Sequence, residues 1–477
     1  MDAARAVSGG IVRSSRSLNI HVDLPLDADH FDGTRRAGER PSLITMPTVD
    51  DDLPSGLDPE QFSARIFGTG APRSGAGLEL APFRGVRFGP RVDPSAVTCP
   101  PYDLLDRDQV ERLKAGEGHN IVRLTLPEDY REAASTLRRW LADGTLITDP
   151  APALYLYETG GRRGLIGALG LRAEADKVVL PHENVYPGPV RDRLALMTET
   201  RANLEPIFLV YEGGGDTARI IDATAEGPPL LDFHADGQTH RLWSITDPAL
   251  HARVAADLGP RQALIADGHH RYATYRALQA RAAPGDRHDR NAWDYGLALL
   301  VDSTRHPPHL GAIHRVLPGL PPDAALRGAA EVFTTNELAW PEALPALRNA
   351  RGPAFLLGGG EGLHLLTDPK ADLLERVMPA GHSPRWRALD TAVLDHLLIG
   401  SVWRVPEDEH SVEVVHDDPL AAVERARRTG GTAVILNPLK VEDVLAVAAE
   451  GDRVPRKSTS FAPKPRTGLV LRLLDLG

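Results

Sequence analysis

From about residue 80 onward, apolar positions switch repeatedly between helical and strand spacing. The apolar residues of 132–144 fall on one helical stripe, with Gly144 just past the expected helix end. Two apolar segments, 153–158 and 164–173, flank a Gly-Gly-Arg-Arg turn, which predicts a pair of strands. Further along we expect a strand over 261–267, a helix over 271–282 and a buried strand over 292–303.

The same alternation resumes after a proline-rich seam near 317–322. Strands are predicted over 355–360, 363–367, 412–416 and 432–437, and helices over 386–400, 419–430 and 441–450. The apolar part of 386–400 is too short to cross a membrane. The pattern as a whole, which has no internal repeat, predicts a mixed α/β or α+β fold.

The chain divides by pattern into four segments. Residues 1–78 mix Gly, Ser, Pro, Asp and Arg without a sustained period, which predicts a disordered N-terminal extension. We expect an N-terminal α/β segment over 79–248, a phosphate-binding segment over 249–320 and a C-terminal α/β segment over 321–477.

The charge and the cysteine content argue against several classes of partner and cofactor. The 477 residues include 54 Lys and Arg against 65 Asp and Glu, for a net charge of −11, which disfavours nucleic acid as the main partner. A local basic pocket can still bind a small acidic ligand. The single cysteine, Cys99, excludes an intramolecular disulfide, a Cys-based zinc site and an iron–sulfur cluster. Between Thr98 and two prolines it is best interpreted as a small buried filler.

Targeting signals are not apparent. No run of about 18 apolar residues predicts a membrane-spanning helix. The first residues lack the continuous apolar core of a secretory signal. We therefore expect a cytoplasmic protein without a membrane partner.

The sharpest chemical motif is Asp267-Gly268-His269-His270-Arg271, where a strand runs into a helix. The start of a helix exposes backbone N–H groups that suit an anion, and Gly268 permits a tight turn. Arg271 is a candidate phosphate ligand, either histidine could transfer a proton, and Asp267 could hold Mg²⁺. A capped helix with solvent-facing histidines is the alternative, but so many phosphate-compatible groups in five residues favour a functional turn.

A second motif is Pro-His-Glu at 181–183, followed by Arg191 and Arg193. Glu183 is a candidate base for a substrate hydroxyl, and His182 and Arg193 are candidate substrate contacts. The same residues fit a surface cluster of salt bridges equally well.

The third motif is the C-terminal run 454–468, where cations, hydroxyls and prolines alternate. The chain has six lysines, and two of them, Lys457 and Lys464, lie in this run. Together with Ser458 and Thr459 they form a candidate phosphate or carboxylate clamp, the alternative being a basic surface loop.

A fourth loop, 98–103, presents Tyr102 and Asp103. It is either a wall of the substrate site or a plain turn, and the residues alone favour the turn. Both side chains are candidate substrate contacts. No P-loop, H-E-x-x-H or G-x-S-x-G motif is found, which argues against the enzyme classes that those motifs define.

Five motifs occur in order: Pro-Phe-Arg-Gly at 82–85, Pro-Pro-Tyr-Asp, Pro-His-Glu, Ile-Ala-Asp-Gly-His-His-Arg-Tyr and the terminal Lys-Ser-Thr run. Together they resemble the bacterial and archaeal "domain of unknown function ten-fifteen" family, from about residue 80 to the end. The Asp-Gly-His-His-Arg turn is similar to the phosphate-binding turn of ParB/sulfiredoxin-like proteins, which include free-serine kinases. The resemblance implies a ParB/sulfiredoxin-like core over 249–320, flanked by additional α/β segments, and a link to serine metabolism.

These observations give a leading hypothesis and two alternatives. The leading one is a nucleotide-dependent phosphotransferase acting on a small molecule, most concretely free L-serine, with Mg²⁺ and ATP or ADP. The ligand is then a small phosphorylated compound or an amino acid. The alternatives are a phosphatase or nucleotide hydrolase, and a non-catalytic nucleotide-binding regulator.

Overall fold

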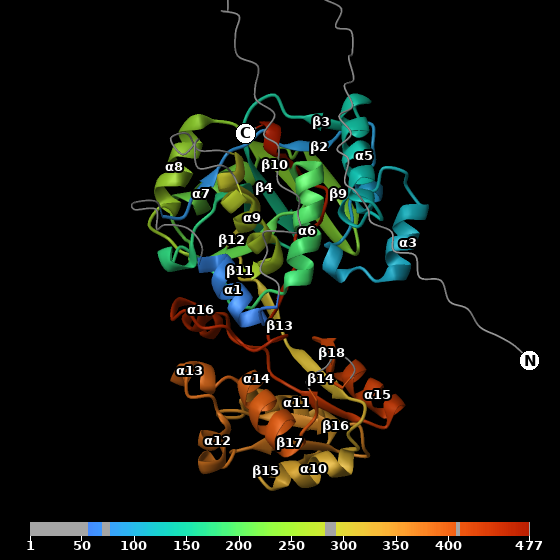
Figure 1. Ribbon diagram of the computed structural model, residues 1–477, viewed down its shortest axis with the longest axis vertical. Coiled ribbons are helices and arrows are strands. Elements are labelled where there is room, and N and C mark those ends of the chain that lie inside the picture. Colours follow the sequence, from blue (N-terminus) through green and yellow to red (C-terminus); the bar gives the residue numbers. More distant parts are fainter. Residues whose placement is uncertain (1–55, 69–76, 282–291, 407–410, 477) are drawn as a thin grey trace, which may run out of the picture. The chain divides into compact units, whose positions relative to one another are not determined.

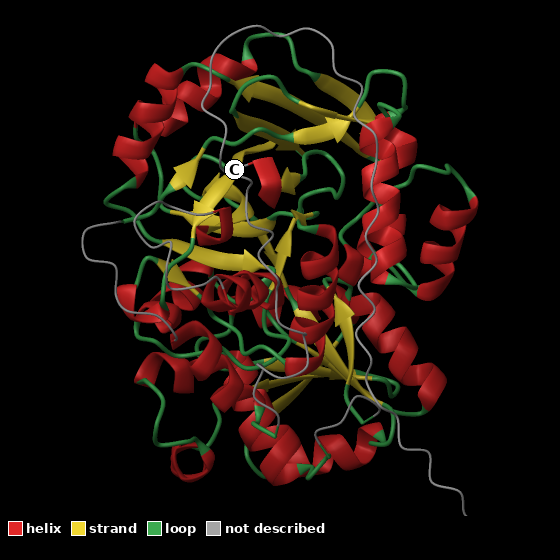
Figure 2. Cartoon of the chain, turned by 45° about the horizontal axis from the view of Figure 1, so that its top comes forward, coloured by secondary structure: helices red, strands yellow, loops and turns green. Residues whose placement is uncertain are grey.

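The computed structural model describes residues 56–68, 77–281, 292–406 and 411–476. The chain divides into two units, Met1–Pro47 and Thr48–Gly477, and every described residue belongs to the second. Its described elements form a mixed α+β structure, in which strands are flanked by helices (Figure 2). The expected mixture of helices and strands is thus confirmed, whereas the ParB/sulfiredoxin-like core stays a prediction.

Among the described residues, the larger sheet has nine strands in the order β6-β11-β8-β12-β5-β4-β10-β9, with β1 paired to β5. Figure 1 labels β4, β9, β10, β11 and β12 of this sheet. Strand β11 runs parallel to β6, and β12 runs parallel to β8, while the other pairs are antiparallel. The strands are β1 Leu80–Ala81, β4 Leu154–Thr159, β5 Arg162–Gly170, β6 Val179–Leu180, β8 Ile207–Tyr211, β9 Leu231–Ala235, β10 Gln238–Ile245, β11 Ala263–Asp267 and β12 Tyr295–Asp302.

Two glycines make the tight turn between β4 and β5 possible. Thr159 pairs with Arg162, which leaves Gly160 and Gly161 as a two-residue connection. Both have positive φ, at 55° and 73°, the backbone that a tight hairpin with right-handed strand twist needs. The predicted strand pair is therefore confirmed.

Both faces of the central strands are covered. Leu209 of β8 and Ile265 of β11 pack in a cluster with helices α1, α6 and α9, whereas Phe208 and Leu264 point into a second cluster with α16 and the C-terminal run. This alternation explains why these strands read as continuous apolar runs. The helices around this sheet are α1 Pro59–Gly68, α6 Pro187–Thr200, α7 Asp216–Ala225, α8 Pro248–Leu258, α9 His269–Arg281 and α16 Val441–Ala449.

A group of small elements lies outside the larger sheet, with β2–β3 and β21–β7 as separate strand pairs. It includes the predicted helix near 132–144, observed as α5 Tyr130–Ala142 and packed through Leu137 and Trp140. The other elements are β2 Val86–Phe88, β3 Leu146–Thr148, α2 Pro94–Val97, η1 Tyr102–Leu104, α3 Arg107–Ala115, α4 Val122–Thr125, η2 Glu174–Asp176, β7 Ala202–Asn203, η4 Ala292–Asp294, β21 Arg472–Leu473 and η6 Leu474–Leu476.

The second main sheet has, in the described part of the chain, six strands in the order β15-β17-β16-β19-β14-β18. They are β14 Ile313–Leu317, β15 Thr334–Leu338, β16 Phe355–Gly358, β17 Leu363–Thr367, β18 Glu413–His416 and β19 Thr432–Ile435. Helix α10 Pro322–Ala330 packs on one face of this sheet, and helices α11 Trp340–Asn349 and α15 Pro419–Thr429 pack on the other. Nearby lie α12 Ala371–Val377 and the short pair β13 His309–Gly311 and β20 Ser460–Ala462.

Three expectations need correction. Residues 59–68, expected to be disordered, form α1, because Phe62, Ile66 and Phe67 make a buried stripe; residues 1–55 and 69–76 lie outside the described residues. The larger sheet crosses the expected boundary at 248/249, since β11 and β12 pair with earlier strands. The single helix expected over 386–400 is instead α13 Pro384–Arg387, α14 Asp390–Val393 and a π-helix, η5 Leu394–Val402.

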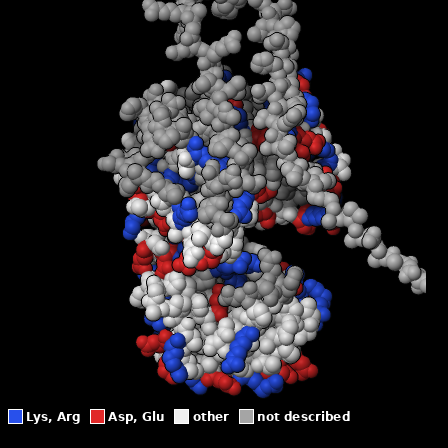
Figure 3. Space-filling model, viewed as in Figure 1, with Lys and Arg blue, Asp and Glu red and all other residues white. Residues whose placement is uncertain are grey.

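In the described parts of the chain, no helix combines the length and the apolar character that a membrane crossing requires. On the face drawn in Figure 3, Lys and Arg are interspersed with Asp and Glu outside the grey regions.

Candidate functional site

The site is built around the end of β11. The strand stops at Asp267, Gly268 turns with φ 93°, and α9 begins at His269. A Cβ on Gly268 would lie 3.0 Å from Ile207 Cγ2 and 3.1 Å from an Arg271 nitrogen, so this position suits glycine both in backbone and in space. The predicted strand–turn–helix is confirmed as a local structure.

Contacts from distant segments bring the sequence motifs together at this turn. Backbone hydrogen bonds join Cys99 to Thr467 in both directions, which fixes the 98–103 loop against the C-terminal run. The Val454 N–H donates to the His182 carbonyl at 2.9 Å, which attaches the Pro-His-Glu loop to the same run. Strand β20 pairs with β13 immediately after Thr459. The C-terminal run therefore bridges the three other motifs.

One part of the site is a chain of charges. Arg271 donates to Asp267 Oδ2 at 2.6 Å and to the Pro206 carbonyl at 2.6 Å. Lys464 Nζ lies 2.6 Å from Asp267 Oδ1 and 2.5 Å from Asp103 Oδ2. Burial alone would raise the pKa of Asp267, but the charges of Lys464 and Arg271 hold that pKa below its usual value. Asp267 is thus ionised, with a cation on each oxygen.

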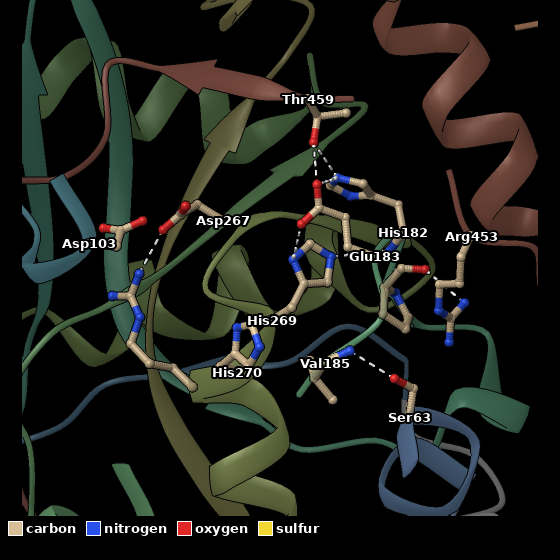
Figure 4. Close-up of polar contacts among 12 residues, drawn as sticks. Ser63, Asp103, His182, Glu183, Val185, Asp267, His269, His270, Arg453 and Thr459 are labelled. Carbon is tan, nitrogen blue, oxygen red and sulfur yellow. Dashed lines mark hydrogen bonds and ion pairs between the residues drawn. The ribbon is translucent and has the colours of Figure 1, made fainter. Parts of the chain in front are cut away.

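The other part surrounds Glu183 (Figure 4). The Thr459 hydroxyl donates to Glu183 Oε1 at 2.9 Å and lies 2.9 Å from His182 Nε2. Because that hydroxyl proton goes to Glu183, Nε2 of His182 must carry the proton in its own hydrogen bond to Thr459. On the opposite side, His269 Nδ1 lies 4.0 Å from Glu183 Oε2. Glu183 is thus held between a hydroxyl and an imidazole.

The tautomers of the paired histidines follow from backbone donors. The His182 N–H donates to His269 Nε2 at 3.1 Å, which leaves the proton of a neutral His269 on Nδ1, the atom that faces Glu183. The Tyr186 N–H donates to His270 Nε2 at 3.0 Å. The orientations of His269 and His270 are therefore each fixed by a main-chain N–H, from His182 of the Pro-His-Glu loop and from Tyr186 just after it.

Burial is the main cause of the shifted pKa values of Glu183 and the three histidines around it. It raises the pKa of Glu183 to about 7, an effect that the Asp267 charge reinforces and that the Thr459 hydrogen bond opposes. Burial lowers the pKa of His182 to about 3 and of His270 to about 4, and it holds the pKa of His269 well below its usual value. At neutral pH the three imidazoles are neutral, and Glu183 is the group poised to exchange a proton.

Several predicted contacts are buried supports of the site. Arg193 donates to the Thr125 carbonyl at 2.7 Å, and its guanidinium lies 4.7 Å from the Tyr102 ring centroid. Arg271 lies 5.8 Å from the same centroid. Ser458 is buried, whereas Lys457 is exposed and lines a cavity next to Glu183.

That cavity has a volume of about 750 Å³. Glu183, Tyr186 and His270 line it from the larger sheet's side, and Arg315, His382 and Trp386 come from residues 313–399. The volume falls in the range of sites for cofactors and drug-sized ligands. Glu183 therefore faces a space that can hold a small molecule.

Sequence reasoning missed two residues that brace the site. Glu205 accepts hydrogen bonds from the Tyr102 N–H at 3.2 Å and from the Thr467 hydroxyl at 2.8 Å. Arg453 donates to the Pro181 carbonyl at 3.0 Å and pairs with Glu174 at 2.6 Å. Neither belongs to a contiguous chemical motif, so no pattern in the sequence marks them.

The donor set does not fit a resident Mg²⁺ at Asp267. Both of its oxygens already bind cations, and the described residues contain no group of three or more His, Cys, Asp or Glu side chains that could hold a metal ion. A Mg²⁺ ion would need one of these oxygens, and gaining it would mean displacing Lys464 or Arg271.

A comparison with known protein families gives a match over most of the chain. The family model described as "Protein of unknown function (DUF1015)" matches residues 80–392. The chain belongs to the DUF1015 family. The Asp-Gly-His-His-Arg turn and the Pro-His-Glu loop lie inside the matched region, whereas the C-terminal run lies outside it.

The DUF1015 chain is also similar to solved structures. A free serine kinase in complex with AMP is 16% identical over 66% of this chain and 93% of that chain, with a TM-score of 0.34. A conserved hypothetical protein from Pyrococcus furiosus is 16% identical over 66% and 97%, with a TM-score of 0.32. SbnI with a C-terminal truncation, from Staphylococcus aureus, is 12% identical over 65% and 88%, with a TM-score of 0.33. A search of curated proteins found no match.

Proposed function

We propose that this DUF1015 protein is a nucleotide-dependent phosphotransferase whose acceptor is the hydroxyl of a small molecule. The observation that carries the proposal is Glu183: a carboxylate with its pKa raised to about 7, hydrogen-bonded by the neutral Thr459 hydroxyl and facing a cavity. A general base works best when its pKa lies near the working pH.

In the proposed step, Glu183 takes the proton of the acceptor hydroxyl. The hydroxyl oxygen forms a bond to the terminal phosphorus of the nucleotide, and the bond from that phosphorus to the bridging oxygen breaks. The bridging electron pair leaves with the shortened nucleotide. Atoms and charge balance, because the proton stays on Glu183 until solvent removes it.

The turn at the start of α9 supports the phosphate side of this proposal. The first amide groups of a 13-residue helix have no acceptor within the helix, so they can bind phosphate oxygens. Lys464 adds a positive charge beside Asp267, where it can neutralise charge on the transferred group. His269, His270 and Arg271 then act by holding the turn and Glu183 in place, rather than by proton transfer.

Because Asp267 is occupied by Lys464 and Arg271, we route no step through a metal bound to it. We propose ATP or ADP as the phosphoryl donor. Free L-serine, a small compound with one hydroxyl, is the most concrete acceptor.

The test is a product screen. Purified protein is incubated with Mg²⁺, L-serine and either ATP or ADP, and phosphoserine is measured by mass spectrometry together with free phosphate. Phosphoserine from one of the nucleotides supports the kinase. Free phosphate without phosphoserine would contradict the kinase proposal and favour a phosphatase or nucleotide hydrolase. Tight nucleotide binding without any product would contradict it as well and favour a non-catalytic nucleotide-binding regulator.

A further inference from the structure

The cavity beyond Glu183 contains a buried arginine that forms no direct ion pair within the described residues. Arg315, in β14, is 3% exposed and lines the cavity. Its guanidinium donates only to carbonyls, those of Ile313 at 2.8 Å and Arg456 at 3.2 Å, and within the described residues it makes no ion pair. Burial lowers the pKa of Arg315, and the charge of Asp395, which lines the same cavity, acts in the opposite direction. Because no carboxylate contacts the guanidinium directly, its place at the cavity wall leaves it available to a negatively charged ligand.

A second arginine lines the same cavity. Arg456, whose carbonyl receives the hydrogen bond from Arg315, lines the same cavity. Its guanidinium carbon lies 4.6 Å from the Tyr186 ring centroid, and it too has no ion-pair partner in the described part of the chain. Two planar guanidinium groups that line one cavity offer donors that match the oxygen geometry of phosphates.

The same cavity has a flat aromatic surface. The rings of His382 and Trp386 are stacked, with centroids 3.8 Å apart and an angle of 11°. His382 is held by Asp452 at 2.7 Å, and Trp386 donates to the Arg453 carbonyl at 2.5 Å. Although Trp386 covers one face of His382, the His382 side chain remains 30% exposed, and it lines the cavity.

An irregular helix completes this wall. Asp395, His396 and Ile399, on the π-helix η5, line the cavity. Runs of π-helix are rare and are frequently found at functional sites. These residues add polar groups next to the aromatic surface and the two arginines.

We propose that this cavity is the nucleotide pocket, with the base against His382 and the phosphates on Arg315 and Arg456. The terminal phosphate then points to the end of the cavity where Glu183 and His270 lie. This inference rests on the proposed function, and it assigns the binding of the donor to residues that lie outside the motifs read from the sequence. The volume of about 750 Å³ suits a nucleotide and far exceeds what free serine needs.

The test measures ADP binding to the full chain by isothermal titration calorimetry. The variants are Arg456→Gln and His382→Ala, with Arg376→Gln as the control, since Arg376 is an exposed arginine paired with Asp372. We expect each cavity variant to weaken ADP binding roughly 10-fold or more, and the control to bind like the wild type. Arg456 is exposed, so its substitution leaves the core intact.

Competition by pyrophosphate, which has no base, distinguishes residues that contact the phosphates from residues that contact the base. Arg456→Gln is expected to weaken its competition with ADP, whereas His382→Ala is not. Wild-type affinity for ADP in both cavity variants would overturn the pocket assignment while leaving the proposed function standing. Failure of the wild-type protein to bind either ADP or ATP would instead overturn the proposed function, and this inference with it.

Discussion

Thr459 donates its hydroxyl proton to Glu183 Oε1 at 2.9 Å, although the two residues are 276 positions apart. The contact joins the C-terminal run to the Pro-His-Glu loop, and the same hydroxyl meets His182. Because it is a hydrogen bond to the charged form of Glu183, it lowers a pKa that burial raises. Thr459 therefore tunes the pKa of the proposed base.

Replacing Thr459 by valine should shift the pH dependence of phosphotransfer. Loss of the hydroxyl removes an effect that lowers the Glu183 pKa, so the midpoint of the kcat/KM profile should move to higher pH by about one unit. Thr459→Ser should restore the wild-type midpoint. Thr429→Val, on an exposed helix end, is the matched control. Lower activity with an unmoved midpoint would mean that Thr459 has only a structural role.

Glu183 should make the protein less stable as the pH rises. Its folded-state pKa of about 7 exceeds the unfolded value near 4.3, so the folded state binds more protons between these values. Unfolding free energy therefore falls from about pH 4.5 to 7. The full shift corresponds to about 4 kcal/mol, and the 32% exposure of the side chain reduces this to about 1–2 kcal/mol.

Urea unfolding of Glu183→Gln checks this linkage. The variant should be more stable than the wild type at pH 8 and should match it near pH 4, where both side chains are neutral. Equal stability at both values would show that Glu183 is ionised at little cost and would weaken its assignment as the base.

Lys464→Met should destabilise the fold. Lys464 lies between Asp267 and Asp103, and removing it leaves two carboxylates with less compensation. We expect a loss of about 2–3 kcal/mol at pH 7, less than for a fully buried pair because Asp103 keeps solvent contact. The loss should shrink at low pH, where protonation of Asp267 removes the interaction in the wild type as well. Lys370→Met, at an exposed lysine, is the control; equal losses in both variants would refute the network.

Cys99 should not react in the native protein. Its side chain is fully buried, and burial raises the pKa of the thiol, with the Glu205 charge acting in the same direction. A thiol-labelling reagent should therefore leave the native chain unmodified and activity unchanged, and it should label one cysteine in urea. Rapid labelling of the native chain would contradict the buried position.

The turn at the end of β11 could be predicted from the sequence because its polar residues are contiguous in the chain. Asp267 to Arg271 follows an apolar strand directly, and both the turn and its glycine appear as expected. The sequence could not distinguish cations that meet a ligand from cations that support the fold. Arg193 and Arg456 both lie in polar, arginine-containing motifs of the sequence. Arg193 is nevertheless buried against a carbonyl and Tyr102, whereas Arg456 lines the cavity.

The far wall of the cavity was also invisible in the sequence. Arg315, His382 and Trp386 are isolated residues, and they reach one cavity through sheet pairing and the break in the helix expected over 386–400. The break itself could not be predicted, because the apolar positions of α14 and η5 also fit a regular helix.

The most direct test of the account is phosphoryl transfer by Glu183→Gln compared with the wild type, across pH 6–9 and at equal occupancy by nucleotide. The amide keeps the size of the side chain but cannot accept the proton. We predict a loss of about 10²–10⁴-fold in kcat with nucleotide binding retained, and a wild-type profile that rises through a midpoint near 7. A Glu183→Gln variant with wild-type turnover would contradict the assignment of Glu183 as the base.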